Sequence, residues 1–375
     1  MTWAASKRAK RYAVGFMHNN NDKQTKGGEA KAKPEVIKLG LDLHARQVTE
    51  CRQLDGSTPK PAQRWDPWKL LDQVEGWIKA GIKVYSCYEA GACGYWYHRE
   101  LSKRGAMNFV VAPRPLENQR TKHQKTDRLD ARALLNSLES YLRGNQNAMS
   151  IVAVPTPEEE QQRSVVRYRE QLLRDRRRAE ARGRGLLLSQ GVLAPGRWWQ
   201  PAVWEEFKKE LPRWTIPQVE HWQGRALEAD RSERELRQRL QEMVQLVLPV
   251  GVGTLSWIIL EHELRGWDRF GNRRQIASYT GLCPGVHRSD QRGREGHINR
   301  CGNATVRYIL IEMSWRLLRW QPQYPPIQKL RRGLLSKRAK RRIIVAVARR
   351  LAIDLWRWST GRANAQELGL RLEQR

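Results

Sequence analysis

The chain has few cysteines, few phenylalanines and no long apolar run. Its five cysteines are odd in number and form no Cys-x-x-Cys pair, which argues against a disulfide framework or a cysteine-based zinc site and favours a reducing cytoplasm. The longest uninterrupted apolar run, Ile343–Ala348, falls far short of the about 20 residues that a membrane-spanning helix needs. Because the N-terminus lacks an apolar segment before small residues, we expect neither secretion nor a membrane partner.

Acidic residues are also scarce relative to basic ones. The 375 residues include 69 Lys and Arg against 39 Asp and Glu, a formal net charge of +30. A surplus of this size points to a polyanion as partner. The apolar fraction of 40% is enough for a sizeable core, and the length suggests two or three domains.

The N-terminal part divides into a tail and a mixed segment. Residues 1–33 contain eight Lys or Arg and no apolar period, which predicts a basic flexible tail. Residues 34–150 alternate between strand and helix patterns, which predicts an α/β sheet domain. The expected strands are Val36–Leu43, Gln47–Leu54, Lys83–Tyr88 and Asn108–Ala112, and the expected helices are Trp68–Ala80, Tyr95–Lys103 and Leu129–Leu142.

Residues 151–247 read as a helical region. Two long helices, Glu158–Gln190 and Val219–Val247, carry apolar residues near heptad spacing, which favours an antiparallel coiled coil. This pair is either an oligomer seam, the interpretation we favour, or a packed helical pair within one chain. The heptad positions are Val165, Tyr168, Leu172 and Ala179 on the first helix and Leu236, Leu240, Met243 and Val247 on the second, with a Trp-rich insert between them.

Residues 248–328 and 329–375 form a mainly helical C-terminal region. Gly251 and Gly253 precede a helix at Thr254–Leu264, a turn that resembles a helix-hairpin-helix DNA contact or is a plain turn. Further helices are expected at Arg273–Thr280 and Thr305–Trp320, with Gly281–Asn303 as a loop between them. A basic helix is expected over Lys329–Arg350, and its candidate phosphate contacts are Arg331, Arg332, Lys337, Arg338, Lys340, Arg341 and Arg342.

Four acids stand where a metal-dependent nuclease needs them. Asp42 lies inside the first strand, Glu89 follows the strand at Lys83–Tyr88, and Asp127 and Asp130 share one face at a helix start. A strand acid, a strand-end acid and a helical pair can converge and bind two Mg²⁺ about 4 Å apart, which stabilises in-line phosphodiester displacement. For Asp127 alone, a surface charge is the simpler reading, whereas an acid inside an apolar strand needs a reason.

One serine stands among cations in the segment at Gly281–Asn303. Ser289 is close in sequence to two histidines and to four arginines, His287, His297, Arg288, Arg292, Arg294 and Arg300. A serine hydroxyl becomes a nucleophile with a base nearby, and arginines can stabilise a phosphoryl centre. From the residues alone, a nucleic-acid-binding loop with a bystander serine is the favoured interpretation.

These motifs together resemble the DEDD-type insertion-sequence transposases of the one-hundred-and-ten family, which are bridge-RNA-guided recombinases. The likeness extends over about Val36–Trp320. In the N-terminal part it rests on Gly-x-Asp at Asp42, Tyr88-Glu89-Ala90 and Lys-Thr-Asp-x-x-Asp-Ala at Asp127 and Asp130. In the C-terminal part it rests on Leu248-Pro249-x-Gly251-x-Gly253, Tyr279-x-Gly281-Leu282-x-Pro284, Ser289 and Gly296-x-Ile298-x-Arg300-x-Gly302-Asn303-x-x-x-Arg307.

The resemblance implies a fold, a mechanism and partners. It implies a RuvC-like, RNase H-type N-terminal domain, a coiled coil and a C-terminal transposase domain. It implies Ser289 as nucleophile beside a Mg²⁺-binding cluster of Asp42, Glu89, Asp127 and Asp130, with Asn303 and Arg307 among the nucleic-acid contacts. The implied partners are element DNA, target DNA and a noncoding bridge RNA, and the implied assembly is a homo-oligomer, a dimer or tetramer, acting on the bacterial nucleoid.

The serine segment departs from the family pattern. Arg288 and Asp290 flank Ser289, where the family commonly has Ser or Thr before the nucleophile and Gly after it. The base for Ser289 is His287, His297 or a hydroxide on the metal. Two other functions compete with the recombinase: a RuvC-type junction nuclease that uses water as nucleophile, and a non-catalytic nucleic-acid-binding derivative.

Overall fold

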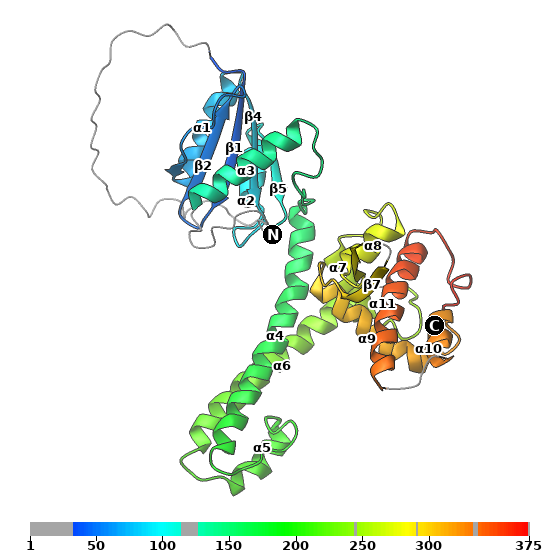
Figure 1. Cartoon of the computed structure of the whole chain (residues 1–375). Coiled ribbons are helices and arrows are strands. Elements are labelled where there is room, and N and C mark those ends of the chain that lie inside the picture. Colours follow the sequence, from blue (N-terminus) through cyan, green and yellow to red (C-terminus); the bar gives the residue numbers. More distant parts are fainter. Residues whose placement is uncertain (1–32, 114–126, 244–245, 290–291, 333–336, 374–375) are drawn as a thin grey trace. The chain divides into compact units, whose positions relative to one another are not determined.

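The computed structural model describes residues 33–113, 127–243, 246–289, 292–332 and 337–373, and the side chains of residues 286–296 and 332–340 lie outside this description. The chain forms two compact units, Met1–Val154 and Pro155–Arg375 (Figure 1). The predicted basic tail lies outside the described residues apart from Lys33. None of the described helices is both long and apolar enough to cross a membrane.

A mixed five-stranded sheet forms the centre of the first unit. Its strand order is β3-β2-β1-β4-β5. Strand β1 pairs antiparallel with β2 and parallel with β4, and β5 continues the parallel part. This confirms the predicted strands, while β3 is too short to show an alternating pattern. The strands are β1 (Val36–Leu43), β2 (Val48–Leu54), β3 (Gln63–Trp65), β4 (Lys83–Glu89) and β5 (Met107–Val111).

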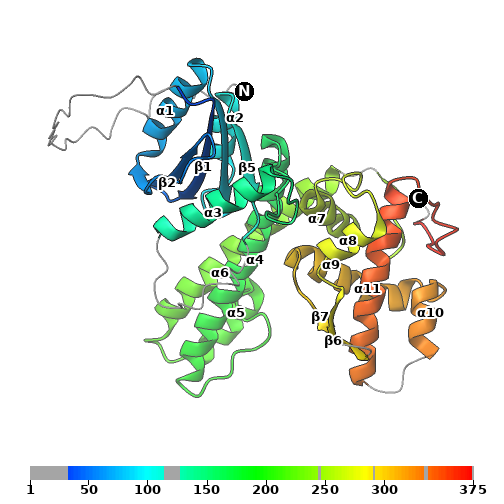
Figure 2. The ribbon, with the colours of Figure 1, turned by 45° about the horizontal axis from the view of Figure 1, so that its top comes forward.

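Helices cover both faces of this sheet (Figures 1 and 2). Helices α1 (Pro67–Lys79) and α2 (Trp96–Lys103) pack on the face that carries Leu39 and Leu41 of β1. Helix α3 (Asp127–Leu142) crosses the opposite face and contacts β1, β2 and β4. The period-2 alternation of β1 therefore sends its leucines to one core and its intervening residues towards α3.

Two long helices begin the second unit. Helix α4 (Pro157–Leu188) starts at a capping box in which Thr156 and Glu159 exchange hydrogen bonds, and α6 (Ile216–Glu242) packs along it. Arg169 pairs with Glu233 and Arg176 with Asp230, so higher numbers on α4 meet lower numbers on α6 and the helices are antiparallel, as predicted. They pack within one chain, and an oligomer seam along them stays a prediction.

The residues at this helical seam agree with the predicted heptad only in part. Tyr168 and Met243 are 57% and 64% exposed, and Val247 lies beyond the end of α6. The buried positions on α4 include Val166, Leu172 and Ala179, and on α6 they include the charged Asp230 and Glu233. Leu172, Ala179 and Leu240 are buried as predicted, but the register was wrong at Tyr168 and Met243. Arginine-paired acids occupy seam positions on α6, and a hydrophobic pattern does not reveal them.

The Trp-rich insert is a small core of its own. Trp198, Trp204 and the short helix α5 (Pro201–Phe207) pack between the distal ends of α4 and α6, followed by a 3-10 turn at Lys208–Glu210. Gly183 of α4 faces Trp198 so closely that a Cβ atom would lie 2.3 Å from the ring. These indoles therefore fill a core rather than present an aromatic surface.

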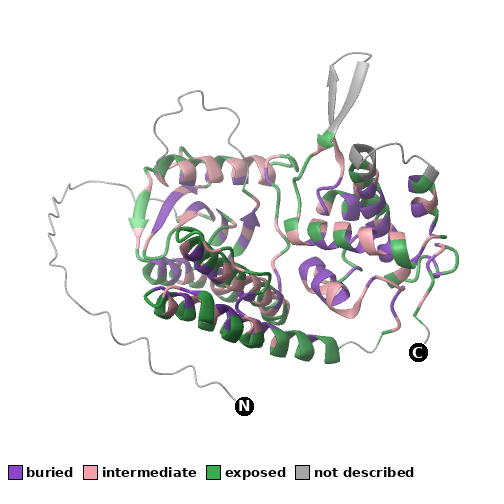
Figure 3. Cartoon of the chain, turned by 90° about the horizontal axis from the view of Figure 1, so that it is seen from below, coloured by how far each residue is buried: buried purple, intermediate pink, exposed green. Residues whose placement is uncertain are grey.

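The rest of the second unit is mainly helical, as predicted. Its helices are α7 (Thr254–Leu264), α8 (Arg273–Tyr279), α9 (Ala304–Trp320), α10 (Pro325–Arg332) and α11 (Lys337–Ser359). The buried residues form stripes on the helices, with exposed residues on their outer faces (Figure 3). The long helices α9 and α11 follow this pattern, and their apolar sides meet in one core.

Two expectations in this region were wrong. The predicted single helix Lys329–Arg350 is two helices, α10 and α11, because each buries its own apolar residues, Ile327 and Leu330 on one and Ile344 and Val347 on the other. The predicted loop contains an antiparallel hairpin of β6 (Pro284–Ser289) and β7 (Arg292–Ile298). Glycine and arginine make up four of the seven residues of β7, and β6 has a single fully aliphatic residue, Val286, so neither strand shows the apolar alternation that signals a strand.

Candidate active site

Parallel pairing of β1 with β4 brings two of the predicted acids to one edge of the sheet. Leu41 pairs with Tyr88, so Asp42 and Glu89 each lie one residue further along adjacent strands. Glu89 in turn pairs with Val111 of β5. The carboxyl ends of parallel strands meet at the same edge, the place where α/β sheets carry their ligand sites.

A glycine sets the distance between α3 and the acid on β1. A Cβ atom on Gly40 would lie 2.2 Å from the carbonyl oxygen of Ala131 and 2.4 Å from the nitrogen of Leu135, so only glycine lets α3 approach this closely. Lys38, on the same face of β1, forms an ion pair with Glu139 near the other end of α3. The antiparallel crossing therefore places the first turn of α3 near Asp42.

The structure brings Asp42 and Asp127 together, with a histidine between them. One ligand atom each from Asp42, His44 and Asp127 lies within 4.8 Å of the others. His44 Nε2 lies 3.1 Å from Asp42 Oδ2 and 3.7 Å from Asp127 Oδ1, and Arg64 Nη2 lies 3.6 Å from Asp127 Oδ2. Sequence reasoning missed His44 and Arg64, although His44 is only two residues from Asp42.

Asp42, Glu89 and Asp130 line a pocket of about 240 Å³ at this edge. We call this the acid pocket. Its other walls come from the ends of β4 and β5 and from Ala133, Leu134 and Ser137 of α3. The four predicted acids thus surround one place, three along the acid pocket and Asp127 beside Asp42.

The acid pocket raises the pKa of Asp42. Burial is the largest cause, the charge and hydrogen bond of His44 oppose it, and the nearby carboxylates of Asp127 and Asp130 raise the pKa further. Gathered carboxylates of this kind repel one another in the ionised state, and a bound cation relieves the repulsion. The carboxylate oxygens fit a hard divalent ion, and the imidazole of His44 adds a nitrogen donor that transition metals also accept.

Ser289 lies at the tip end of the hairpin in the second unit. It is the last residue of β6 and pairs with Arg292, the first residue of β7, while His287 pairs with Arg294. The side chains of these residues, and that of Arg288, lie outside the described part of the chain. Asp290 lies outside it entirely.

Two glycines of the family motif close the base of this hairpin. A Cβ atom on Gly302 would lie 2.5 Å from the backbone nitrogen of Gly281, and one on Gly281 would lie 2.6 Å from the guanidinium of Arg307. Arg307 Nη1 donates to the carbonyl oxygen of Thr280 at 3.2 Å, and the exposed Arg300 adopts a left-handed φ of 56°. The hairpin base is thereby fixed between the end of α8 and the start of α9.

Several other predicted nucleic-acid contacts have structural partners. Asn303 caps α9 by accepting from the backbone nitrogens of Thr305 and Val306, and its amide donates to Glu263 at 2.7 Å. Glu263 also accepts from Arg163 and Arg167 of α4, an interaction that sequence reasoning missed. Nucleic-acid contacts by Asn303 and Arg307 stay predictions.

The glycine turn before α7 packs against α9. Gly251 and Gly253 have φ values of 85° and 74°, which favour glycine, and a Cβ atom on Gly251 would lie 3.3 Å from Trp320. A Cβ atom on Gly253 would lie 3.0 Å from the guanidinium of Arg316. The conformation thus requires both glycines whether or not the turn touches a phosphate.

The predicted basic residues of α10 and α11 are only partly described. Arg331, Arg341 and Arg342 are exposed. The side chains of Arg332, Lys337, Arg338 and Lys340 lie outside the described part of the chain. Contacts from all seven to phosphate stay predictions.

Comparison with known proteins identifies the chain's relatives. The model of the Transposase IS116/IS110/IS902 family matches residues 249–326, which include the serine hairpin. A Sinorhizobium fredii protein named as a transposase, y4rJ, is 32% identical over 307 residues, covering 72% of this chain and 75% of the relative. The transposase for insertion sequence element IS1328 of Yersinia enterocolitica is 23% identical over 340 residues, covering 86% and 96%.

A third relative is the transposase for insertion sequence element IS1111A of Coxiella burnetii, 25% identical over 300 residues that cover 74% of this chain and 78% of the relative. The similarity thus extends well beyond the matched family segment and reaches into the first unit. The chain belongs to the IS116/IS110/IS902 family of insertion-sequence transposases, which are DNA phosphoryl-transfer enzymes.

Proposed function

We propose that this transposase cuts and rejoins DNA with Ser289 as nucleophile and the acid pocket as a Mg²⁺ site. The observation that carries the proposal is the meeting of Asp42 with Asp127, and of Asp42, Glu89 and Asp130 around one pocket. The mixed sheet with acids on two adjacent parallel strands and on the helix that crosses them supports an RNase H-type, RuvC-like assignment for the first unit.

Mg²⁺ held by Asp42, Glu89, Asp127 and Asp130 would supply Lewis-acid stabilisation of charge on the scissile phosphate. The chain's own groups do the rest. Ser289 Oγ forms a bond to phosphorus as the bond from phosphorus to the leaving DNA oxygen breaks, and the serine proton passes to a base such as His287 or His297. Arg292, Arg294 and Arg300 stabilise the developing negative charge.

A serine ester suits recombination because it conserves the phosphoester bond. Transfer from serine to a new DNA hydroxyl exchanges one ester for another, whereas hydrolysis would discard the bond. The acids and the serine belong to different units, so the reaction needs both units at one phosphate, from one copy of the chain or from two copies of a homo-oligomer. A noncoding bridge RNA that pairs with element DNA and target DNA would select the sites, held by the basic residues of the second unit.

A denaturing gel of protein with labelled junction DNA tests the serine. Wild-type protein should leave a covalent protein–DNA adduct under trapping conditions, and Ser289→Ala should leave none and not recombine. Ser278→Ala, at an exposed serine of α8, is the matched control and should behave as wild type. If Ser289→Ala still recombines, serine is not the nucleophile. If wild type yields hydrolysed ends and no adduct, the acid pocket works as a nuclease that uses water as nucleophile. The observation that favours this second function is that all four acids come from one unit.

A further inference from the structure

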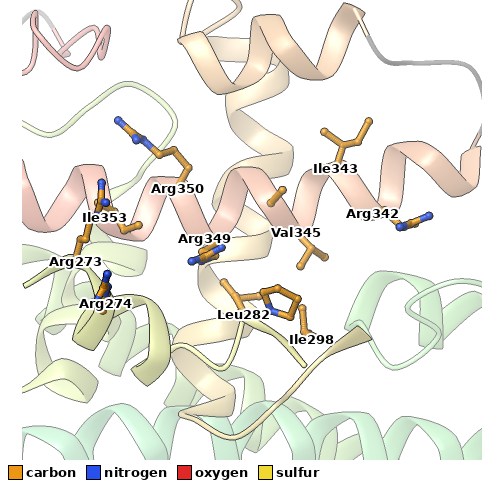
Figure 4. A pocket seen from close by; sticks show the side chains of 12 residues that line it. Arg273, Arg274, Leu282, Ile298, Arg342, Ile343, Val345, Arg349, Arg350 and Ile353 are labelled. Carbon is orange, nitrogen blue, oxygen red and sulfur yellow. The ribbon is translucent and has the colours of Figure 1, made fainter. Parts of the chain in front are cut away.

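A pocket of the second unit is lined by arginines and contains none of the residues assigned to catalysis. Its volume is about 740 Å³. It lies between α8, α11 and the base of the serine hairpin, and we call it the arginine groove (Figure 4). Its basic residues are Arg273 and Arg274 of α8 and Arg342, Arg349 and Arg350 of α11.

The charge of the arginine groove is largely uncompensated. Arg350 has a partner, since its Nε donates to Asp354 at 2.9 Å. For the other four arginines, the described part of the chain offers no carboxylate within 4 Å. All four are exposed, and no carboxylate is among the residues that line the groove. Like charges gathered around one concavity repel each other and attract an anionic ligand.

The floor of the arginine groove is apolar. Leu282 and Ile298 come from either side of the hairpin base, and Val345 and Ile353 come from α11. In Figure 4, Val345 and Arg349 lie over Leu282 and Ile298, so apolar and cationic groups face the same space. A pocket of this size holds a ligand of roughly drug size, the scale of one or two nucleotides.

We infer that the arginine groove binds unpaired nucleotides of a nucleic-acid strand. A duplex keeps its base faces stacked inside and offers phosphates and groove edges, which a convex basic helix face would contact equally well. An unpaired strand also offers exposed bases, which enter apolar pockets and stack on guanidinium planes, while its phosphates meet the arginines. A concave site with an apolar floor and a cationic rim therefore fits an unpaired strand better than a duplex.

The location gives this site a place in the reaction. Pro284 and Ile298 pair at the hairpin base, and Ser289 lies five residues further along β6, about 17 Å at the usual rise of a strand. A strand held in the arginine groove would thus lie one hairpin length from the proposed nucleophile. The inference rests on the proposed handling of DNA and RNA by this chain but needs neither the serine nor the acids.

Binding of labelled oligonucleotides to the full-length protein tests the inference. The probes are single-stranded DNA, single-stranded RNA and a DNA duplex, each of about 12 nucleotides or base pairs, within the range that such sites cover. Arg274→Ala with Arg349→Ala should weaken single-strand binding about 100-fold and lower the slope of log K against log salt by about 1.4, because each lost phosphate contact contributes about 0.7. Arg237→Ala with Arg239→Ala, two exposed arginines of α6, removes the same charge and should change neither.

A second variant separates the pocket from its charge. Ala346→Trp fills the groove from an exposed position on α11 without altering charge, and it should weaken single-strand binding while leaving duplex binding unchanged. RNA bound more tightly than DNA would identify a guide strand as the ligand, and the reverse would identify an unpaired DNA segment. Unchanged single-strand binding by Ala346→Trp, or an equal loss of duplex and single-strand binding by the arginine variant, would overturn the inference. Binding of an oligonucleotide does not require strand cleavage. The outcome of the binding test is therefore independent of whether Ser289→Ala abolishes the covalent adduct.

Discussion

Two carboxylates, the half-buried Asp42 in the first unit and the fully buried Glu263 in the second, have pKa values displaced in opposite directions. Burial would raise the pKa of Glu263, but hydrogen bonds from Arg167 and Asn303 and the charges of Arg163 and Arg167 hold it below the ordinary value of 4.5. Burial also raises the pKa of Asp42, and there the neighbouring acids add to the effect of burial. The carboxylate of Glu263 is thus paired with cations, whereas the carboxylate of Asp42 lies close to other carboxylates.

This difference separates a structural acid from a candidate functional one. Glu263 has a fully buried side chain, and its partners lie on α4 and at the start of α9, so it ties the long helix to the helical core. At the acid pocket the only basic side chains paired with the acids among the described residues are His44 and Arg64, which are 47% and 60% exposed. Uncompensated negative charge costs stability, and the natural reason to keep it is a cation that binds during function.

The largest expected effect comes from removing a carboxylate at the acid pocket. Asp42→Asn should lower strand transfer at least about 10³-fold, because it removes a metal ligand from the place where phosphate charge must be stabilised. The measurement is recombination of labelled DNA with Mg²⁺ as the sole divalent ion. Asp72→Asn, at an exposed acid of α1, is the control and should keep full activity. Full strand transfer by Asp42→Asn would contradict the metal assignment.

Substitution of Glu263 should have the opposite consequence, a loss of stability with the chemistry kept intact. Glu263→Gln should lower the free energy of unfolding by about 3 kcal/mol, because Arg163 and Arg167 lose a buried counter-charge. The remaining folded protein should still form the adduct with DNA. Urea titration measures the loss, with Glu220→Gln at an exposed position of α6 as the control. A change below 0.5 kcal/mol, the size typical of surface substitutions, would show that the ion pairs are not a structural tie.

The contact between α3 and β1 should decide both stability and activity. Gly40→Ala forces a methyl group against the backbone of Ala131 and should cost about 2 kcal/mol through overpacking. It should also lower strand transfer, because α3 must shift and carry Asp127 and Asp130 with it. Gly76→Ala in α1 meets nothing within 4 Å and should instead stabilise the helix by up to about 1 kcal/mol. Equal effects of the two substitutions would argue against the close approach.

The smallest effect is a pH dependence of opposite sign at the two acids. A raised pKa means that the folded state holds the Asp42 proton more tightly, so Asp42 destabilises the fold above its folded pKa and not below its ordinary value of 3.8. In the presence of EDTA, Asp42→Asn should therefore be more stable than wild type at pH 7, and the difference should vanish as pH falls towards 3.8.

For Glu263 the sign is reversed. Its lowered pKa contributes stability above the ordinary value of 4.5, and this contribution is lost as pH falls through the folded pKa. The cost of Glu263→Gln should thus be fully present at pH 7 and shrink below pH 4.5. Unfolding titrations from pH 7 downward follow both variants, and parallel curves would remove the distinction between the two acids.

Local patterns in the sequence determined most of the secondary structure and the identity of the acids. Period-2 and helical spacing predicted β1, β4 and α3 because side-chain burial follows backbone geometry within a few residues. An acid inside an apolar strand marked Asp42, since such a position needs a functional or electrostatic reason. The hairpin at Ser289 escaped prediction because β7 is rich in glycine and arginine and neither strand shows apolar alternation.

Only the tertiary structure decided which charges meet. The parallel register of β1 with β4 placed Asp42 beside Glu89, and the close crossing at Gly40 brought Asp127 to the same edge, through contacts between residues far apart in the chain. Glu263 looked like an ordinary helical acid until α4 folded back to supply its arginines. Arg274 and Arg349 became one groove in the same way, because long-range packing, unlike helical or strand period, leaves no local pattern to read.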